Sequence, residues 1–135
     1  MFEGEYLNGK RNGKWKEYNL DGEIIFEGEY KDDKKWNGKG YDEDGNVIYE
    51  INNGNGKIKE YNNYGKLIFE GEYAKGKRNG FGKEYRFGEL IFEGDYCNGQ
   101  RWNGKGKEYH LNGRLNFEGK YLNGKKTDNN CQIFY

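Results

Sequence analysis

The sequence FEGEY at residues 69–73 decides the fold, because close copies of it recur along the whole chain. Copies of this pentad, one of them diverged, begin at Phe2, Phe26, Tyr49, Phe69, Phe92 and Phe117. Successive starts, at 2, 26, 49, 69, 92 and 117, therefore lie 20 to 25 residues apart. Self-similarity at a near-constant period of this length indicates a repeat protein, in which each copy is one supersecondary unit. The pattern predicts a repeat array over residues 1–124.

Each repeat contains two segments in which apolar and charged residues alternate. In the first repeat a turn region at residues 8–13 separates the pentad from a second alternating segment at residues 14–18. A period of two is typical of a strand with one buried face, and Asn and Gly accept the positive φ of tight turns. We therefore predict an all-β fold: an elongated, single-layer, twisted antiparallel sheet of consecutive β-hairpins. Residues 125–135 leave the pattern and are predicted to form a C-terminal cap or tail.

The alternation divides the side chains of each repeat between two faces. In the second repeat Phe26, Gly28 and Tyr30 share one face, and Glu27 and Glu29 share the other. The second strands carry lysines on one face and mostly glycine on the other, and the sequence leaves two registers open. We favour the register with lysines beside glutamates, because opposite charges directly across a strand pair stabilise it by about 0.2–1 kcal/mol. That register also lays the Phe and Tyr rings over glycine backbone.

The composition limits the classes of function and the compartment. The chain has 135 residues with 23 basic and 23 acidic side chains, so no net charge draws it to nucleic acid. Aromatic residues make up 18% of the chain, which argues against disorder. Cys97 and Cys131 occupy non-equivalent repeat positions, which favours reduced thiols. Met1 leads directly into the first pentad and no apolar run is long enough for a membrane span, so we expect a cytoplasmic protein.

The aromatic face is the first candidate binding surface. A single sheet leaves part of its apolar face uncovered, and an uncovered apolar stretch is a binding site by default. Trp36 and Trp102 occur only in the turn regions of the second and fifth repeats. Each is expected either to fold back onto a neighbouring turn or to serve as an exposed anchor, a role in which Trp is enriched. The candidate partner-binding residues are Phe26, Tyr30, Trp36, Phe69, Tyr73, Phe92, Tyr96 and Trp102.

Basic residues in the first turn region of each repeat are the second candidate. Because equivalent turns of an array line one long edge, these side chains are expected to form a basic row there. The row serves either to solvate the turns or to bind an anionic partner. Its members are Lys10, Arg11, Lys34, Lys35, Lys77, Arg78 and Arg101, continued by Lys125 and Lys126.

Residues typical of catalysis are either isolated or repeated. The single histidine, His110, precedes a turn, and no Cys/His spacing suits zinc. Paired carboxylates such as Glu70 and Glu72 resemble the acid pair of a glycosidase, but they recur along the array, whereas an active site needs one unique constellation. No helix follows the glycines of Gly38-x-Gly40, so a phosphate cradle is not expected. We therefore predict a protein without enzymatic activity, metal or cofactor.

The repeat resembles that of the MORN-repeat family. The family unit joins an aromatic-x-Gly-x-aromatic strand, a glycine turn, a Gly-x-Gly second strand and a closing glycine, and the fourth repeat here reads FEGEY…G…NGFGKEY…G. The resemblance covers residues 2–124, and the Lys-Glu-Tyr second strand is also similar to bacterial antitoxins of the YwqK type. Many members have Trp at the second aromatic position and His in the turn, where this chain has Tyr and Asn. Its third repeat also has Ile51 in place of the pentad glycine.

The resemblance implies a scaffold, because MORN arrays mostly act by binding other proteins. We therefore expect an interaction module that takes an extended or helical segment of a partner protein on its grooved aromatic face. One alternative is binding of acidic phospholipid headgroups by the basic row, which would hold the chain peripherally at a membrane. Another is an antitoxin-like or immunity-like protein that sequesters a toxin. Self-association through the two open edge strands is a further hypothesis.

Overall fold

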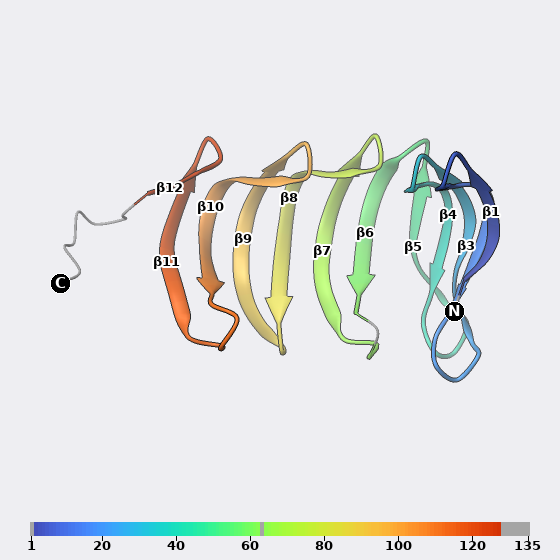
Figure 1. The fold of residues 1–135 in the computed structure, drawn as a ribbon, viewed down its shortest axis with the longest axis horizontal. Helices are drawn as coiled ribbons and strands as arrows, with labels where there is room; N and C mark the ends of the chain where they lie inside the picture. The colour runs from blue at the N-terminus through green and yellow to red at the C-terminus, as the bar shows by residue number, and fades with distance from the viewer. Residues whose placement is uncertain (1, 63, 128–135) are drawn as a thin grey trace.

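The computed structural model describes residues 2–62 and 64–127, which form twelve β-strands in a single sheet. The strands lie side by side in chain order, and every neighbouring pair is antiparallel (Figure 1). The predicted sheet of consecutive hairpins is therefore confirmed. The strands are β1 (Phe2–Leu7), β2 (Lys10–Tyr18), β3 (Ile24–Lys31), β4 (Lys34–Tyr41), β5 (Val47–Asn52), β6 (Asn55–Tyr61), β7 (Leu67–Ala74), β8 (Lys77–Arg86), β9 (Glu89–Cys97), β10 (Gln100–Tyr109), β11 (Leu115–Leu122) and β12 (Lys125–Thr127).

The sheet is one layer thick, and its turns line two long edges (Figure 1). The turns from β1 to β2, β3 to β4 and so on to β12 lie at the top of the view and are called the upper edge. The turns β2–β3, β4–β5, β6–β7, β8–β9 and β10–β11 lie at the bottom and are called the lower edge. Strands β1 to β5 overlap in this view whereas β6 to β11 are spread out, because the sheet twists along its length.

The upper turns are shorter than predicted. Asn8 and Gly9 alone connect β1 and β2, with φ of 53° and 79°, the two positive values that a type I′ turn requires. Asn12 and Gly13, which were predicted as part of the turn region 8–13, lie within β2 at a shift in its register with β1. The second Asn-Gly pair thus belongs to a β-bulge, and bulges favour the same residues as turns.

The diverged third repeat and the residues after the last repeat depart from the common pattern in different ways. In the diverged third repeat Asn53 and Gly54 alone join β5 to β6. Of the predicted C-terminal cap or tail at 125–135, Lys125–Thr127 form β12 and pair with β11. Residues 128–135 lie outside the described residues.

Hydrogen bonds join each upper turn to the hairpin before it. Oδ1 of Asn79 accepts a hydrogen bond from the backbone N–H of Asn98 at 3.1 Å, and the carbonyl oxygen of Arg78 accepts one from Gly99 at 2.8 Å. Equivalent bonds are accepted by the side chains of Asn37, Asn55 and Asn103. The recurring asparagine therefore ties successive hairpins together along the upper edge.

Replacing Asn79 with Ala is expected to lower the free energy of unfolding by about 1 kcal/mol, because one inter-hairpin hydrogen bond is lost while water still reaches the freed N–H. Urea unfolding followed by circular dichroism measures the change. Asn116, which is exposed on β11, provides the control, and its replacement with Ala is expected to stay within about 0.5 kcal/mol of the parent. Equal losses at both positions would show that the link between turns contributes nothing.

The strand register is the one that sets lysines beside glutamates. Glu27 on β3 lies directly opposite Lys16 on β2 and Lys39 on β4. The Nζ atom of Lys16 is 3.9 Å from a carboxylate oxygen of Glu27, and both side chains are about half exposed. Such exposed pairs are worth at most about 1 kcal/mol each. They help to select this register but add little to the free energy of folding. The face that carries them is called the outer face.

The opposite face, called the inner face, holds the aromatic core, and glycine makes room for it. A Cβ atom on Gly82 would lie 2.8 Å from the Phe69 ring and 3.1 Å from Tyr96. One on Gly106 would lie 2.8 Å from Phe92. The expectation that the rings lie over bare backbone is therefore confirmed, and any larger residue at these glycines would displace a core ring.

The buried residues form two clusters along the array. The first contains Trp15, Phe26, Tyr30, Tyr49, Ile51 and Ile58, and the second contains Phe69, Phe92, Tyr96 and Tyr121. Tyr73 packs against both clusters and so joins them. In the third repeat, which has no second aromatic residue in its pentad, Ile51 and Ile58 are almost completely buried and fill the core instead.

Candidate functional site

The aromatic residues predicted to contact a partner are the core of the array. Phe26 and Phe69 are 0% exposed, Phe92 is 1%, and Tyr30 and Tyr96 are 5% and 4%. A partner cannot reach these five rings in the folded chain, whereas Tyr73, Trp36 and Trp102 are only partly buried and remain candidates. The inner face presents instead the polar side chains that cover the rings.

Basic side chains from the start of the second strands cover the rings. The guanidinium carbon of Arg78 lies 4.1 Å from the ring centroid of Phe69, and that of Arg101 lies 4.8 Å from Phe92. A cation over an aromatic ring is attracted by about 0.5–2 kcal/mol, depending on its exposure to water. The same arrangement recurs with Lys35 over Phe26 and Lys126 over Phe117.

Four tyrosine hydroxyls on the inner face each donate a hydrogen bond to a glutamate from a Lys-Glu-Tyr segment. The pairs are Tyr30 with Glu17, Tyr73 with Glu60, Tyr96 with Glu84 and Tyr121 with Glu108. Burial and, after it, the hydrogen bond to Glu108 raise the pKa of Tyr121 to about 12. These hydroxyls are therefore protonated donors at neutral pH.

Basic residues then bridge successive glutamates along the array. Nη2 of Arg78 lies 3.0 Å from Glu60 of the preceding repeat, and its Nη1 lies 3.7 Å from Glu84. Nε of Arg101 lies 2.9 Å from Glu84, and its Nη1 donates to the Tyr121 hydroxyl at 2.9 Å. These side chains and their equivalents are called the polar layer: Glu17, Glu60, Glu84, Glu108, Tyr30, Tyr73, Tyr96, Tyr121, Arg11, Lys35, Arg78, Arg101 and Lys126.

The environment favours the ionised form of two carboxylates of the polar layer, Glu84 and Glu108. Burial alone would raise the pKa of Glu84, but hydrogen bonds from Arg101 and Tyr96 and the charges of Arg101 and Arg78 hold that pKa below its ordinary value. The pKa of Glu108 is also lowered, chiefly by the hydrogen bond from Tyr121. These two carboxylates are thus negative charges held next to basic side chains at neutral pH.

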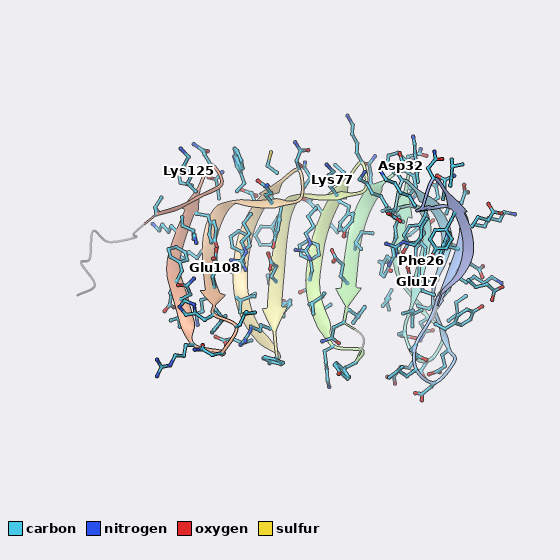
Figure 2. The ribbon with its side chains drawn as sticks, viewed as in Figure 1. Glu17, Phe26, Asp32, Lys77, Glu108 and Lys125 are labelled. Carbon is cyan, nitrogen blue, oxygen red and sulfur yellow. The ribbon has the colours of Figure 1, made fainter. Side chains whose placement is uncertain are left out.

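The predicted basic edge is divided by the structure. Four of its members turn onto the inner face, where they contact acidic or tyrosine side chains: Arg11, Lys35, Arg78 and Arg101. Lys10, Lys34 and Lys77 stay at the upper edge, where Lys77 and Lys125 are seen in Figure 2. The division arises because neighbouring residues of a strand point to opposite faces. Only the second group remains a candidate for an anionic partner.

The two additional tryptophans lie in β-bulges and not in turns. Trp36 and Trp102 fall at register shifts within β4 and β10. A Cβ atom on Gly124 would lie 2.9 Å from the Trp102 ring, so this ring packs on the next upper turn, which is the first of the two predicted alternatives. Trp36 is half-buried, with Nζ of Lys31 4.7 Å from its ring centroid.

The four glutamates of the polar layer were missed as site residues. Their signal was present, since each is the centre of a Lys-Glu-Tyr tripeptide, at residues 16–18, 59–61, 83–85 and 107–109. Figure 2 shows Glu17 and Glu108 at mid-height in the sheet, and Glu17 is the cross-strand partner of Phe26. Alternation placed them on a face but gave no indication of which residues they contact.

A row of apolar side chains on the lower edge was also missed. At the tips of four lower turns, Leu20 is 85% exposed, Tyr64 82% and Phe87 89%, and Leu111 is fully exposed. The strand ends beside these turns expose further apolar residues, namely Val47, Tyr61, Leu90 and Leu115. Most of the large exposed apolar side chains in the described part of the chain therefore gather on one edge.

The described residues contain neither a cluster of metal ligands nor a helix that could span a membrane. Within residues 2–62 and 64–127 no three His, Cys, Asp or Glu side chains come close enough together to hold a metal ion. His110 is exposed at the turn β10–β11. No helix in these ranges is long and apolar enough to cross a bilayer. Cys97 is a half-buried free thiol, and Cys131 lies outside the described residues.

Comparison with known proteins assigns no function to this chain, so a functional proposal has to rest on its surfaces. No model of a known protein family matches the sequence, and no curated protein matches it either.

Proposed function

We propose that this chain is a MORN-like repeat scaffold without enzymatic activity, and that it binds a helical segment of a partner protein across its inner face. The observation that supports the proposal is the polar layer, which recurs with the repeat. One repeat spans two strands, or about 9.6 Å. Seven residues of an α-helix span about 10.5 Å. A helix lying along the array would therefore present one residue of each heptad to each repeat.

An extended segment fits this spacing less well. At about 3.3 Å per residue, three residues of a strand span one repeat, and successive third residues point in opposite directions. A helix keeps the side chains that contact the polar layer on one face over at least two repeats.

The polar layer is also preorganised for binding. Glu60 and Glu84 are held by tyrosine and arginine side chains and are about a quarter and a fifth exposed. Because these groups are already ordered, a partner would not have to immobilise them, and such ordering otherwise costs about 0.5–1.5 kcal/mol per side chain. Glu108 and Lys126 are 35% and 46% exposed and offer the most accessible charges of the layer.

Exchanging the charges of Glu108 and Lys126, as Glu108→Lys with Lys126→Glu, tests this surface. The variant keeps net charge and an ion pair, which is 3.1 Å long in the parent, but reverses its direction. We expect the protein captured from the source cell by the parent to bind the variant at least about tenfold more weakly, and the parent to show slowed hydrogen exchange on β10 and β11 when bound.

The matched control is the same exchange on the outer face, Lys16→Glu with Glu27→Lys, whose side chains are similarly exposed. This control is expected to keep full binding. If the outer-face exchange weakens capture and the inner-face exchange does not, the partner lies on the outer face and the proposal fails.

Recognition of acidic phospholipid headgroups by the upper edge is a second candidate. It is favoured by Lys10 and Lys77, which are exposed at equivalent repeat positions and form no ion pair within the described ranges. Flotation with vesicles containing phosphoinositide at low salt tests it. Binding lost in Lys10→Glu with Lys77→Glu would support this candidate, and a parent that does not float at low salt would eliminate it.

A further inference from the structure

We propose that the lower edge is a self-association surface, on which two copies of this chain pair in antiparallel orientation about a two-fold axis at the turn β6–β7. The inference goes beyond the proposed scaffold function, because it concerns a different surface and a different occupant. It also differs from pairing of the open end strands, since it leaves β1 and β12 free.

The first observation is that the lower turns carry large apolar side chains, although solvent-exposed turns usually carry polar residues. Leu20, Tyr64, Phe87 and Leu111 extend from four of the five lower turns and are more than four-fifths exposed. Turns of this kind need only small or polar residues for their geometry, so folding does not require large apolar side chains there. A row of exposed apolar side chains along one edge is typical of an interaction site.

The second observation is that charge along the lower edge is divided between its two halves. The turns β2–β3 and β4–β5 carry only acidic charged residues: Asp21, Glu23, Asp42, Glu43 and Asp44. From the turn β6–β7 onward the edge carries the basic residues Lys66, Arg86 and Arg114. The one acid in this half, Glu89, is paired with Lys107 at 2.9 Å.

This division identifies a second copy as the occupant. Two such edges in parallel would set acid against acid and base against base, whereas an antiparallel pair sets each acidic half against a basic half. Like charges in contact cost several kcal/mol, so the antiparallel arrangement is selected. An isologous contact about a two-fold axis closes after two copies and does not propagate.

The number of lower turns determines where the two-fold axis of the dimer lies. With five turns, the third falls on itself, the first meets the fifth, and the second meets the fourth. Tyr64 then approaches its own copy, and Leu20 meets Leu111 beside the pair Asp21 and Arg114. Phe87 meets the turn β4–β5, which has no apolar tip of its own but lies beside the exposed Val47.

The size of the contact predicts a weak dimer. Five turns at about 9.6 Å per repeat extend over about 40 Å. A strip of that length and one turn in width falls at the small end of specific interfaces, below about 1,200 Å² in total. We therefore expect dissociation constants in the range of about 1–100 μM and a dimer that weakens as salt is raised.

Sedimentation velocity of the full chain, from about 1 to 500 μM, measures dimerisation and so tests the proposal. Two substitutions of phenylalanine are compared, one in the turn after β8 and one within β8. Phe87→Ser is expected to weaken dimerisation at least about tenfold, because the aromatic tip is lost from both copies. Phe81→Ser, in the middle of β8 and 48% exposed, is expected to leave dimerisation unchanged. A parent that stays monomeric throughout, or equal effects of the two substitutions, would overturn the proposal.

Exchanging charges on the lower edge tests whether the two copies pair in antiparallel orientation. A variant with Asp21→Lys, Glu43→Lys and Asp44→Lys has a mostly basic edge, and one with Arg86→Glu and Arg114→Glu has a mostly acidic edge. Each is expected to be monomeric alone, and an equimolar mixture is expected to form a 1:1 dimer at low salt. Homodimers of either variant, or no dimer in the mixture, contradict the arrangement. If Arg86→Glu disturbs folding by circular dichroism, Arg114→Glu alone replaces it.

Oxidative cross-linking tests the axis. In a background with Cys97→Ser and Cys131→Ser, Tyr64→Cys is expected to form a disulfide-linked dimer, whereas Leu20→Cys is expected to stay monomeric unless mixed with Leu111→Cys. Cross-linking of Leu20→Cys to itself would exclude the antiparallel pairing. Flotation of a monomeric parent with anionic vesicles, lost in Phe87→Ser, would assign the row to a membrane and overturn the proposal.

Discussion

Replacing Phe69 with Ala is expected to lower the free energy of unfolding by about 3–5 kcal/mol. The ring is 0% exposed, meets Tyr96 edge-on at a centroid distance of 5.3 Å and lies beneath Arg78. A single sheet has no second layer that could collapse into the space left behind. Because domains of this kind are stable by only about 5–15 kcal/mol, the variant should lose a large share of its stability.

Guanidinium unfolding followed by circular dichroism measures the loss, and hydrogen exchange locates it. Each repeat contacts only its neighbours, so exchange should increase most in β7 to β9 and least in β2 and β3. Phe81→Ala is the control for residue type, and because that ring is 48% exposed it should lower the free energy of unfolding by less than about 1.5 kcal/mol. Similar losses for the two phenylalanines would mean that the inner face is not the core.

Replacing Arg78 with Met is expected to lower the free energy of unfolding by about 3 kcal/mol. The methionine keeps apolar contact with Phe69, but Glu60 loses both of its hydrogen bonds from the guanidinium. Glu60 and Glu84 are only 24% and 19% exposed, so water replaces the lost partner poorly. Lys126→Met is the control, because Lys126 is 46% exposed and its pair with Glu108 should contribute at most about 1 kcal/mol.

The same substitution should change the dependence of stability on pH. The pKa of Glu84 is lowered in the folded chain from an ordinary value of 4.5. Its ionised form therefore stabilises the fold above about pH 4.5, and that contribution is lost as the pH falls through the lowered folded pKa. Arg78→Met removes one of the charges that lower this pKa, so its stability should fall less steeply between about pH 5 and pH 3.

Unfolding free energies of the parent and of Arg78→Met, measured across that pH range, check the expectation. Parallel curves would show that Arg78 does not stabilise the ionised carboxylates, and the network would then be a packing feature only. A destabilisation below about 1 kcal/mol at pH 7 would lead to the same conclusion.

The sequence by itself determined the all-β fold, the order of the strands and the two faces, and it favoured one of two strand registers. Alternation within each pentad assigns Phe26 and Glu27 to opposite faces without reference to any other part of the chain. The position of glycine opposite large rings, as at Gly82, follows from the same pattern. These features depend on residues within one hairpin, which is why they could be predicted from the repeat.

The tertiary structure alone decided which residues are buried and which surfaces remain open. Arg78 was predicted for an exposed edge because the Asn-Gly pair after it was taken for a turn, but that pair lies in a bulge within β8. Its partners Glu60 and Glu84 come from two other points in the chain, 18 residues before it and 6 after it. The cover over Phe69 is thus assembled from two strands, β6 and β8, and alternation within one strand cannot specify contacts that depend on how neighbouring hairpins are placed.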